Sequence, residues 1–337
     1  MCLIVSYSGC LFIDSPDPMP SSNKSNPFRV LSLSGGGYLG LYSACVLEEL
    51  EARVGEPLGR RFDLIAGTSI GGILALALAY EVPMTALKNL FLEHGQEIFP
   101  FSGHPTGAIS RVLDMARSAL GPKYSGDALR AALTRQLGEQ TLAQAKHNVV
   151  IPAVNVSNGR TKVFKTPHGK SSLADGELLA VDVAMATCAA PGYFPSVRIR
   201  DEVFADGGVY ATAPDQIALH EAEHYLGVER DTVRMLSIGT ATAGYVPREE
   251  VSEEASAIAW LSEGRLVLTL ISVQQQHVKA MMENKLGDRF LRLDAAWQEG
   301  SGLGLDVATD DATNTLMRQA RQTMRVVDTK VLDTFLS

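Results

Sequence analysis

The five residues from Gly67 to Gly71 could carry the chemistry of a serine nucleophile. They read Gly-Thr-Ser-Ile-Gly, which fits the pattern G-x-S-x-G, and they stand between the short apolar run FDLIA and an apolar helical pattern that begins near Ile70. Glycine on both sides lets the backbone crowd around a serine at a sharp turn from a strand into a helix. Such a turn places the hydroxyl of Ser69 at the carboxyl edge of a sheet, where the N-terminus of the next helix favours negative charge. A serine that only caps a helix is the alternative, and the strand–turn–helix context favours the nucleophile.

A second glycine-rich turn, SGGGYLG, ends the predicted strand Arg29–Ser34. Gly35, Gly37 and Gly40 satisfy G-x-G-x-x-G, which is the pattern of dinucleotide-binding folds. That fold needs an acidic residue at the end of the second strand to hold the ribose hydroxyls. The acid of the second predicted strand, Asp63, stands at its beginning instead. The sequence therefore disfavours a nucleotide at this turn.

The same glycines fit an oxyanion hole. Adjacent parallel strands end at the same edge of a sheet, so this turn is expected beside Ser69. Backbone amides without side chains can approach a substrate closely and direct several N–H groups at one oxygen. We predict that the amides of Gly35, Gly36 and Gly37, with that of Ile70, bind a tetrahedral oxyanion.

Asp206 is the first candidate for the base. It follows the predicted strand EVFA and precedes Gly207 and Gly208, so its carboxylate is expected at a strand end on a tight turn. A carboxylate that accepts a hydrogen bond from Ser69 could act as base in a two-residue dyad. An unperturbed aspartate, with a pKa of about 3.9, is a weak base for a hydroxyl, and desolvation would raise that pKa. An ordinary turn aspartate is the alternative.

A histidine base stays open as a second interpretation. The order Ser, Asp or Glu, His of α/β-hydrolases leaves His220, His224 and His277 as candidates. His220 and His224 lie one helical turn apart, which is typical of a solvated helix face, and no third ligand at suitable spacing makes them a metal site. Four further histidines stand in segments that resemble loops or surfaces: His94, His104, His147 and His168.

The wider pattern predicts an α/β fold that can position these turns. Strands and helices alternate, the run HNVVIPAVNVSNGRTKVFKT is a hairpin around Asn158-Gly159, and TVRMLSIGTA is a further buried strand. Helices are predicted over Leu41–Val54, Leu87–Ile98 and Ala108–Leu120. This order indicates a mainly parallel sheet covered by helices. After Ala243 the pattern becomes mostly helical, and a lid, a subunit interface and core packing all remain open for that segment.

Composition limits the classes of partner. The chain has 337 residues with 46% hydrophobic and 20% charged residues and a net charge of −8, which disfavours a nucleic-acid binder. Four cysteines without a C-x-x-C spacing favour a reducing cytoplasm. The apolar N-terminal run has no basic residue before it, unlike a signal peptide, and no apolar run reaches the length of a membrane span.

Three motifs together, SGGGYLG, GTSIGG and DGG, resemble those of the patatin-like phospholipases. The resemblance spans about Phe28 to Pro214. It implies an α/β/α sandwich with a mainly parallel central sheet, Ser69 as nucleophile, Asp206 as base and hydrolysis of lipid acyl esters without a metal. The motif glycines of the family fall on the residues Gly35, Gly36, Gly37, Gly40, Gly67, Gly71, Gly207 and Gly208.

A narrower resemblance concerns HGQEIFP, KYSGDALRAAL, VVIPAVNVSNGRTKVFKTPH and VDVAMATCAAPGYFP, which look like the patatin-like effectors of bacterial CBASS anti-phage operons. It implies a phospholipase that a cyclic dinucleotide such as cyclic GMP–AMP switches on and that degrades phospholipid at the inner membrane. Homo-oligomers are expected as well. The phosphates of a nucleotide would need donors such as Arg230, Arg234, Arg265, Arg289 or Arg292.

Three departures from the family pattern affect the loops around the site. Ser34 stands where aspartate precedes the glycines, Leu39 stands where arginine or lysine is common, and VYATAP replaces an asparagine-rich segment after Asp206. The altered first motif keeps a nucleotide-sensing pseudoenzyme open, and an esterase or thioesterase with a His220 triad is the other alternative.

From these patterns we expect three parts of the chain. Residues 1–27 form an N-terminal arm and linker, residues 28–243 a catalytic domain, and residues 244–337 a mostly helical extension packed on the same domain.

Overall fold

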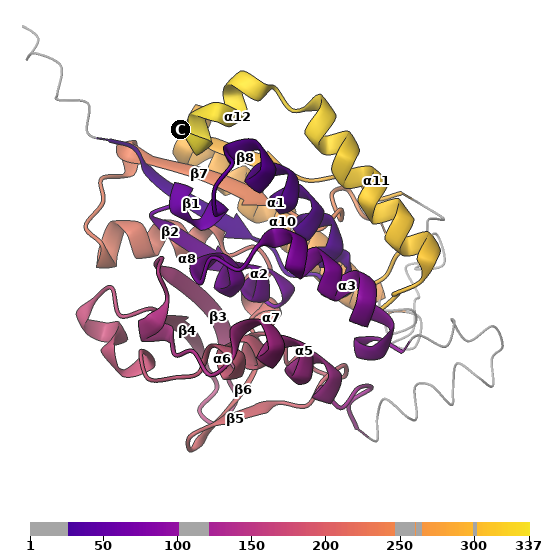
Figure 1. Cartoon of the computed structure of the whole chain (residues 1–337). Coiled ribbons are helices and arrows are strands. Elements are labelled where there is room, and N and C mark those ends of the chain that lie inside the picture. The colour runs from indigo at the N-terminus through magenta and orange to yellow at the C-terminus, as the bar shows by residue number, and fades with distance from the viewer. Residues whose placement is uncertain (1–25, 101–120, 247–259, 261–264, 299–301) are drawn as a thin grey trace, which may run out of the picture.

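The computed structural model describes residues 26–100, 121–246, 260, 265–298 and 302–337. A central sheet lies between helical layers, and the C-terminal helices return along the outside of the N-terminal ones (Figure 1). The expected N-terminal arm, apart from its last two residues, and the helix predicted over Ala108–Leu120 fall outside the described residues.

Eight strands form one sheet in the order β5-β6-β3-β2-β1-β7-β8, with β4 paired to β3. The strands β3, β2, β1, β7 and β8 run parallel to one another, whereas β4, β5 and β6 add antiparallel pairs at one side. Their bounds are β1 Phe28–Leu33, β2 Leu64–Gly67, β3 Val149–Asn155, β4 Arg160–Lys165, β5 Val197–Ile199, β6 Glu202–Asp206, β7 Val233–Ile238 and β8 Phe290–Leu293. The mainly parallel sheet and the hairpin β3–β4 are confirmed.

Helices cover both faces of this sheet, as parallel strands require. The α-helices are α1 Gly40–Val54, α2 Ile70–Ala79, α3 Met84–Ile98, α5 Asp127–Leu137, α6 Ala180–Thr187, α7 Gly208–Ala211, α8 Asp215–His220, α10 Arg265–Leu286, α11 Asp310–Val326 and α12 Thr329–Leu336. Short 3-10 turns occupy Gly37–Leu39, Leu58–Arg61, Leu142–Gln144, Lys170–Asp175, Arg230–Thr232 and Gly287–Arg289, and a π-helical turn extends α8 over Glu221–Tyr225.

The side-chain alternation of β1 explains the two layers. Leu31 and Leu33 point into the larger core with helices α1, α2, α3 and α11, whereas Val30 belongs to a smaller core with α8 and α10. All three side chains are fully buried. Because successive residues of a strand face opposite sides, one short apolar strand supports both helical layers.

The described C-terminal segment is mostly helical, as the sequence predicts, and it also contributes one strand to the sheet. Its strand β8 pairs in parallel with β7, with Arg292 in register with Ser237. Helix α11 packs along α1, where the hydroxyl of Tyr42 donates to Thr323 over 2.9 Å. The amide of Ala243 also bonds the carbonyl of Ala295, so backbone hydrogen bonding joins the two sides of the expected boundary at residue 243. This segment is therefore part of the central sheet and of the core.

Among the described residues, no helix has the length and apolar character needed to span a bilayer.

Candidate active site

Ser69 occupies a strained turn between β2 and α2. Its backbone has φ 54° and ψ −126°, a conformation that side-chain-bearing residues rarely adopt. A Cβ on Gly67 would lie 2.1 Å from the carbonyl oxygen of Gly71, and one on Gly71 would lie 2.3 Å from that of Leu33. Both glycines are thus required for the close approach of the chain, and the strand–turn–helix of the sequence analysis is present.

The hydroxyl of Ser69 donates a hydrogen bond to the carboxylate of Asp206, with 2.6 Å between Oγ and Oδ2. The other carboxylate oxygen accepts from the amide of Gly208 over 2.6 Å. Gly207 packs on β3, since a Cβ there would lie 2.3 Å from the carbonyl oxygen of Pro152. The structure therefore brings together the two residues that the sequence analysis assigned as nucleophile and base, although they lie 137 positions apart.

Burial changes the acidity of Asp206. The side chain is almost fully buried, and this desolvation raises its pKa from 3.8 to about 6, against the opposite effect of the hydrogen bonds from Ser69 and Gly208. Burial together with the charge of Asp206 also raises the pKa of the neighbouring Cys188 thiol well above its ordinary value. At neutral pH the aspartate is ionised and is a far better proton acceptor than an exposed carboxylate.

A threonine that was not among the predicted site residues holds the backbone of Ser69. The amide of Ser69 donates to the hydroxyl of Thr187 over 3.0 Å, and that hydroxyl donates to the carbonyl of Pro152 over 2.6 Å. Thr187 lies in the last turn of α6, a helix rich in small residues that packs on α2 and β3. It lies within the segment VDVAMATCAAPGYFP quoted above, but nothing in that segment marked Thr187 as a residue of the site.

The glycine loop lies against the elbow. A Cβ on Gly35 would contact the Cβ of Ser69 at 3.1 Å, and Gly37 has φ +57° with the carbonyl of Leu305 packed against it. A Cβ on Gly40 would lie 2.5 Å from the side chain of Ile70. The first and second motifs are therefore in direct contact at the edge of the sheet.

The oxyanion amides differ from expectation at one position. The amide of Gly35 donates to the carbonyl of Thr212 over 2.8 Å and is not available for substrate. The amides of Gly36, Gly37 and Ile70 have no acceptor among the residues that the structure describes. These three N–H groups remain as candidates for an oxyanion hole.

The chain after Asp206 links the three motifs. The carbonyl of Ala211 accepts from the hydroxyl of Thr68, the residue before Ser69, over 2.7 Å. The carbonyl of the next residue, Thr212, holds Gly35 as described above. The segment that follows the aspartate is thus bonded to both the elbow and the glycine loop.

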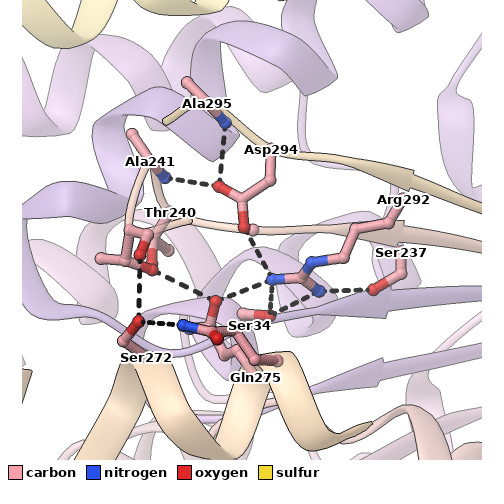
Figure 2. A network of polar contacts seen from close by, with 12 residues as sticks. Ser34, Ser237, Thr240, Ala241, Ser272, Gln275, Arg292, Asp294 and Ala295 are labelled. Carbon is pink, nitrogen blue, oxygen red and sulfur yellow. Dashed lines mark hydrogen bonds and ion pairs between the residues drawn. The ribbon is translucent and has the colours of Figure 1, made fainter. Parts of the chain in front are cut away.

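Beneath the glycine loop lies a buried arginine (Figure 2). The Arg292 side chain is only 5% exposed and donates to four side chains: Ser34 at 3.3 Å, Ser237 at 2.8 Å, Gln275 at 2.7 Å and Asp294 at 2.9 Å. Asp294 also accepts the amides of Ala241 and Ala295. A buried cation is tolerated only with such partners.

Arg292 helps to explain two departures from the family pattern in the first motif, at Ser34 and Leu39. Ser34, which replaces the usual aspartate, accepts hydrogen bonds from Arg292, and Leu39, which replaces the usual cation, is fully buried in the core. A cation is therefore present at this loop, but it comes from strand β8 and not from the motif itself.

The histidines do not join this site. Among the described residues, no histidine hydrogen-bonds Ser69 or Asp206. His220 lies against His224 and lines a separate cavity of about 460 Å³ with Lys162, Lys165 and Tyr225. The other described histidines near charged partners are His94 with Glu97, His147 with Glu81 and His168 with Glu221; His104 lies outside the described residues.

The arginines considered for a nucleotide are dispersed. Arg292 is buried under the glycine loop, Arg230 pairs with Glu223, Arg289 with Asp231, and Arg234 bonds Thr334 of α12. Arg265 stands buried at the start of α10. They therefore define no common phosphate site. In the described part of the chain, no group of three or more histidine, cysteine or acidic residues could hold a metal ion.

Comparison with known proteins agrees with the resemblance of the motifs. Residues 31–219 match the family of patatin-like phospholipases. A "cGAMP-activated phospholipase" from Pseudomonas aeruginosa is 42% identical over 293 residues, which cover 86% of this chain and 85% of the relative. A protein of the same name from Vibrio cholerae is 34% identical over 333 residues, covering 91% of this chain and 93% of the relative. The crystal structure of VipD from Legionella pneumophila aligns with 89% of this chain and 68% of its own at 12% identity and a TM-score of 0.41.

Proposed function

The chain belongs to the patatin-like phospholipase family and is a hydrolase of carboxylic esters, and we propose that it releases fatty acids from membrane phospholipids with a Ser69–Asp206 dyad. The observation that carries this proposal is the 2.6 Å hydrogen bond from Ser69 to Asp206. The absence of a hydrogen bond from any described histidine to either residue supports the buried carboxylate as the proposed base.

The reaction follows from this geometry. Asp206 accepts the proton of Ser69 while Oγ of Ser69 attacks the ester carbonyl carbon. The carbonyl oxygen then becomes an oxyanion beside the amides of Gly36, Gly37 and Ile70. When the tetrahedral intermediate collapses, the ester C–O bond breaks and Asp206 returns the proton to the lysophospholipid alkoxide. Water then loses a proton to Asp206 and attacks the carbonyl carbon of the acyl-serine. When this second intermediate collapses, the bond to Oγ of Ser69 breaks, Asp206 returns the proton to that oxygen, and the fatty acid is released.

The raised pKa of Asp206 supports its role as base. An exposed aspartate, ionised above about pH 4, has little affinity for the proton of a serine. A carboxylate with a pKa of about 6 remains ionised at pH 7 yet takes the proton more readily. It is also acidic enough to give the proton back to the leaving alkoxide, so one group serves both half-reactions.

We further propose that a cyclic dinucleotide, such as cyclic GMP–AMP, activates the enzyme. The relatives from Pseudomonas aeruginosa, Vibrio cholerae and Escherichia coli that carry the name "cGAMP-activated phospholipase" are 42%, 34% and 33% identical to this chain, and each match covers at least 86% of it. The proposed setting is anti-phage defence, in which the activated enzyme acts peripherally on the inner membrane. The altered first motif, which kept a pseudoenzyme open, is offset here by the cation that Arg292 supplies.

Fatty-acid release from vesicles of phosphatidylethanolamine and phosphatidylglycerol tests both proposals. The wild type, Ser69→Ala and His220→Ala are each assayed alone and with a panel of cyclic dinucleotides. We expect release that depends on one nucleotide, is lost in Ser69→Ala and is unchanged in His220→Ala. Release without nucleotide refutes the activation, loss in His220→Ala refutes the dyad, and no release by a folded wild type refutes the phospholipase.

A further inference from the structure

Helix α10 contacts both halves of the catalytic centre through two successive glutamines. We propose that Gln274 and Gln275 are positioning residues, which hold the loop after Asp206 and the glycine loop in the relative placement that catalysis requires. This inference rests on the proposed function, because it concerns the same catalytic centre. It gives a role to the C-terminal segment, which the motifs of the family do not reach.

Gln274 holds the loop after Asp206 by its backbone. Its side-chain amide donates to the carbonyl of Tyr210 over 2.7 Å, and its side-chain oxygen accepts the amide of Thr212. One carboxamide thus pairs with two backbone groups of the same short segment, as a neighbouring strand would. The carbonyl of Thr212 in turn holds the amide of Gly35, so this contact reaches the glycine loop from one side.

Gln275 reaches the glycine loop from the other side, through Arg292 (Figure 2). Its side-chain oxygen accepts from Arg292 at 2.7 Å and from the hydroxyl of Thr242 at 3.2 Å. The same guanidinium nitrogen of Arg292 donates to Ser34 at 3.3 Å. Ser34 directly precedes the glycines, so the position of Arg292 determines where their amides point.

Two glutamines adjacent on one helix necessarily move together. Successive side chains of an α-helix diverge by about 100°, which lets neighbours contact different segments. Gln275 is 4% exposed and the Arg292 side chain 5%, so neither can be replaced by solvent when its partner is lost. A rotation or shift of α10 would therefore displace both the loop after Asp206 and the oxyanion amides.

The next residue of the helix provides a matched control. The side chain of Gln276 donates to Ser272 within α10 itself over 2.9 Å. It has the same chemistry and the same intrinsic helix propensity as Gln274 and Gln275. Replacement of Gln276 by alanine therefore measures what loss of a glutamine costs α10 alone.

A conservative exchange distinguishes the two positions further. The side-chain nitrogen of Gln275 is buried without a hydrogen-bond partner among the described residues, so Gln275→Glu keeps both observed bonds. Gln274 uses both its nitrogen and its oxygen, so Gln274→Glu loses a donor and places a carboxylate oxygen against the carbonyl of Tyr210. We expect glutamate to restore function at position 275 and not at position 274.

The experiment measures kcat and KM for a soluble p-nitrophenyl ester, with the activating nucleotide when the wild type needs one. It also measures the rate at which a fluorophosphonate labels Ser69, and melting temperature reports folding. We expect Gln274→Ala and Gln275→Ala to lower kcat roughly tenfold to a hundredfold with KM nearly unchanged, because small misplacements of catalytic groups have effects of this size. Gln276→Ala and Gln275→Glu should stay within about threefold of the wild type.

The outcomes separate this inference from the function on which it rests. If folded Gln274→Ala and Gln275→Ala keep the kcat of the wild type, or lose no more than Gln276→Ala, the inference is wrong while the phospholipase stands. If the wild type has neither ester hydrolysis nor labelling of Ser69, the proposed function fails and the inference with it. Should Gln275→Ala unfold, Ser34→Ala replaces it, and an unchanged kcat there overturns the Gln275–Arg292 part. Should Gln274→Ala unfold, a folded Gln274→Glu with the kcat of the wild type overturns the Gln274 part.

Discussion

The two halves of the catalytic centre are held in place by different forces. Ser69 and Asp206 lie in a tightly packed region where glycines, the hydrogen bond between the two side chains and a bond from the amide of Gly208 fix the geometry. The glycine loop depends in addition on a buried cation, Arg292, which donates to Ser34 and pairs with Asp294. In the half with Ser69, desolvation raises the pKa of Asp206. In the half with the glycine loop, hydrogen bonds to charged and polar side chains offset the desolvation of Arg292. The chemistry therefore depends on packing in one half and on charge pairing in the other.

The largest expected effect is in the dyad. Asp206→Asn keeps the shape of the side chain but removes the proton acceptor, and Ser69→Ala removes the nucleophile. Each should lower kcat by at least about 10³-fold, and the double variant should be no worse than either, because the two residues act as one unit. Steady-state hydrolysis of a soluble ester measures this, and fully additive losses would contradict the dyad.

Crowding the glycine loop should have the next largest effect. A Cβ on Gly36 would lie 2.6 Å from the hydroxyl oxygen of Thr240, so Gly36→Ala displaces an amide of the oxyanion hole. We expect about a 10²-fold loss of kcat. Gly121→Ala is the control, since nothing lies within 4 Å of a Cβ there. Equal activity of the two variants would show that Gly36 does not face the substrate.

Loss of the buried Arg292–Asp294 pair beside the glycine loop should destabilise the protein. Arg292→Met leaves Asp294 buried without its cation, which should lower the free energy of unfolding by about 3–5 kcal/mol. Arg53→Met breaks an ion pair with Asp333 whose side chains are 36% and 54% exposed, and it should cost less than about 1 kcal/mol. Denaturant titration compares the two variants. A similar cost for both would refute the role of buried charge in holding the loop.

The Asp206→Asn variant should gain stability at high pH, by less than Arg292→Met loses. The folded pKa of Asp206 is raised, so its protonated form favours folding below about pH 4 and this contribution is lost as pH rises through about 6. Removal of the charge should therefore stabilise the protein by up to about 3 kcal/mol at pH 8 relative to pH 4. Unfolding titrations of the wild type and the variant at the two pH values measure this difference. An Asp206→Asn variant less stable than the wild type at pH 8 would argue against a desolvated charge on Asp206.

The same contrast explains which residues of the site could be predicted from the sequence and which could not. Ser69, Asp206 and their glycines are recognisable because backbone constraints at sharp turns demand particular residue types at fixed spacing. The occupied amide of Gly35 was not predictable, since its acceptor Thr212 reaches it only through the folded loop after Asp206.

Arg292 was considered only as a phosphate ligand because β8 has four residues, includes an arginine and lies in a segment with a helical pattern. Its role depends on register with Ser237, which local sequence does not encode. Thr187 and Gln274 were missed for a related reason, since each acts on a backbone group distant in the chain. A polar residue acting in this way leaves no periodic signal.

The pH dependence of kcat/KM tests most directly whether the buried Asp206 is the base. The account predicts an acidic limb with a midpoint near pH 6, tenfold loss per pH unit below it, and the same limb in His220→Ala. A midpoint near pH 4 would mean that desolvation does not tune the aspartate. A limb that moves or disappears when a histidine is replaced would contradict the dyad and restore the triad.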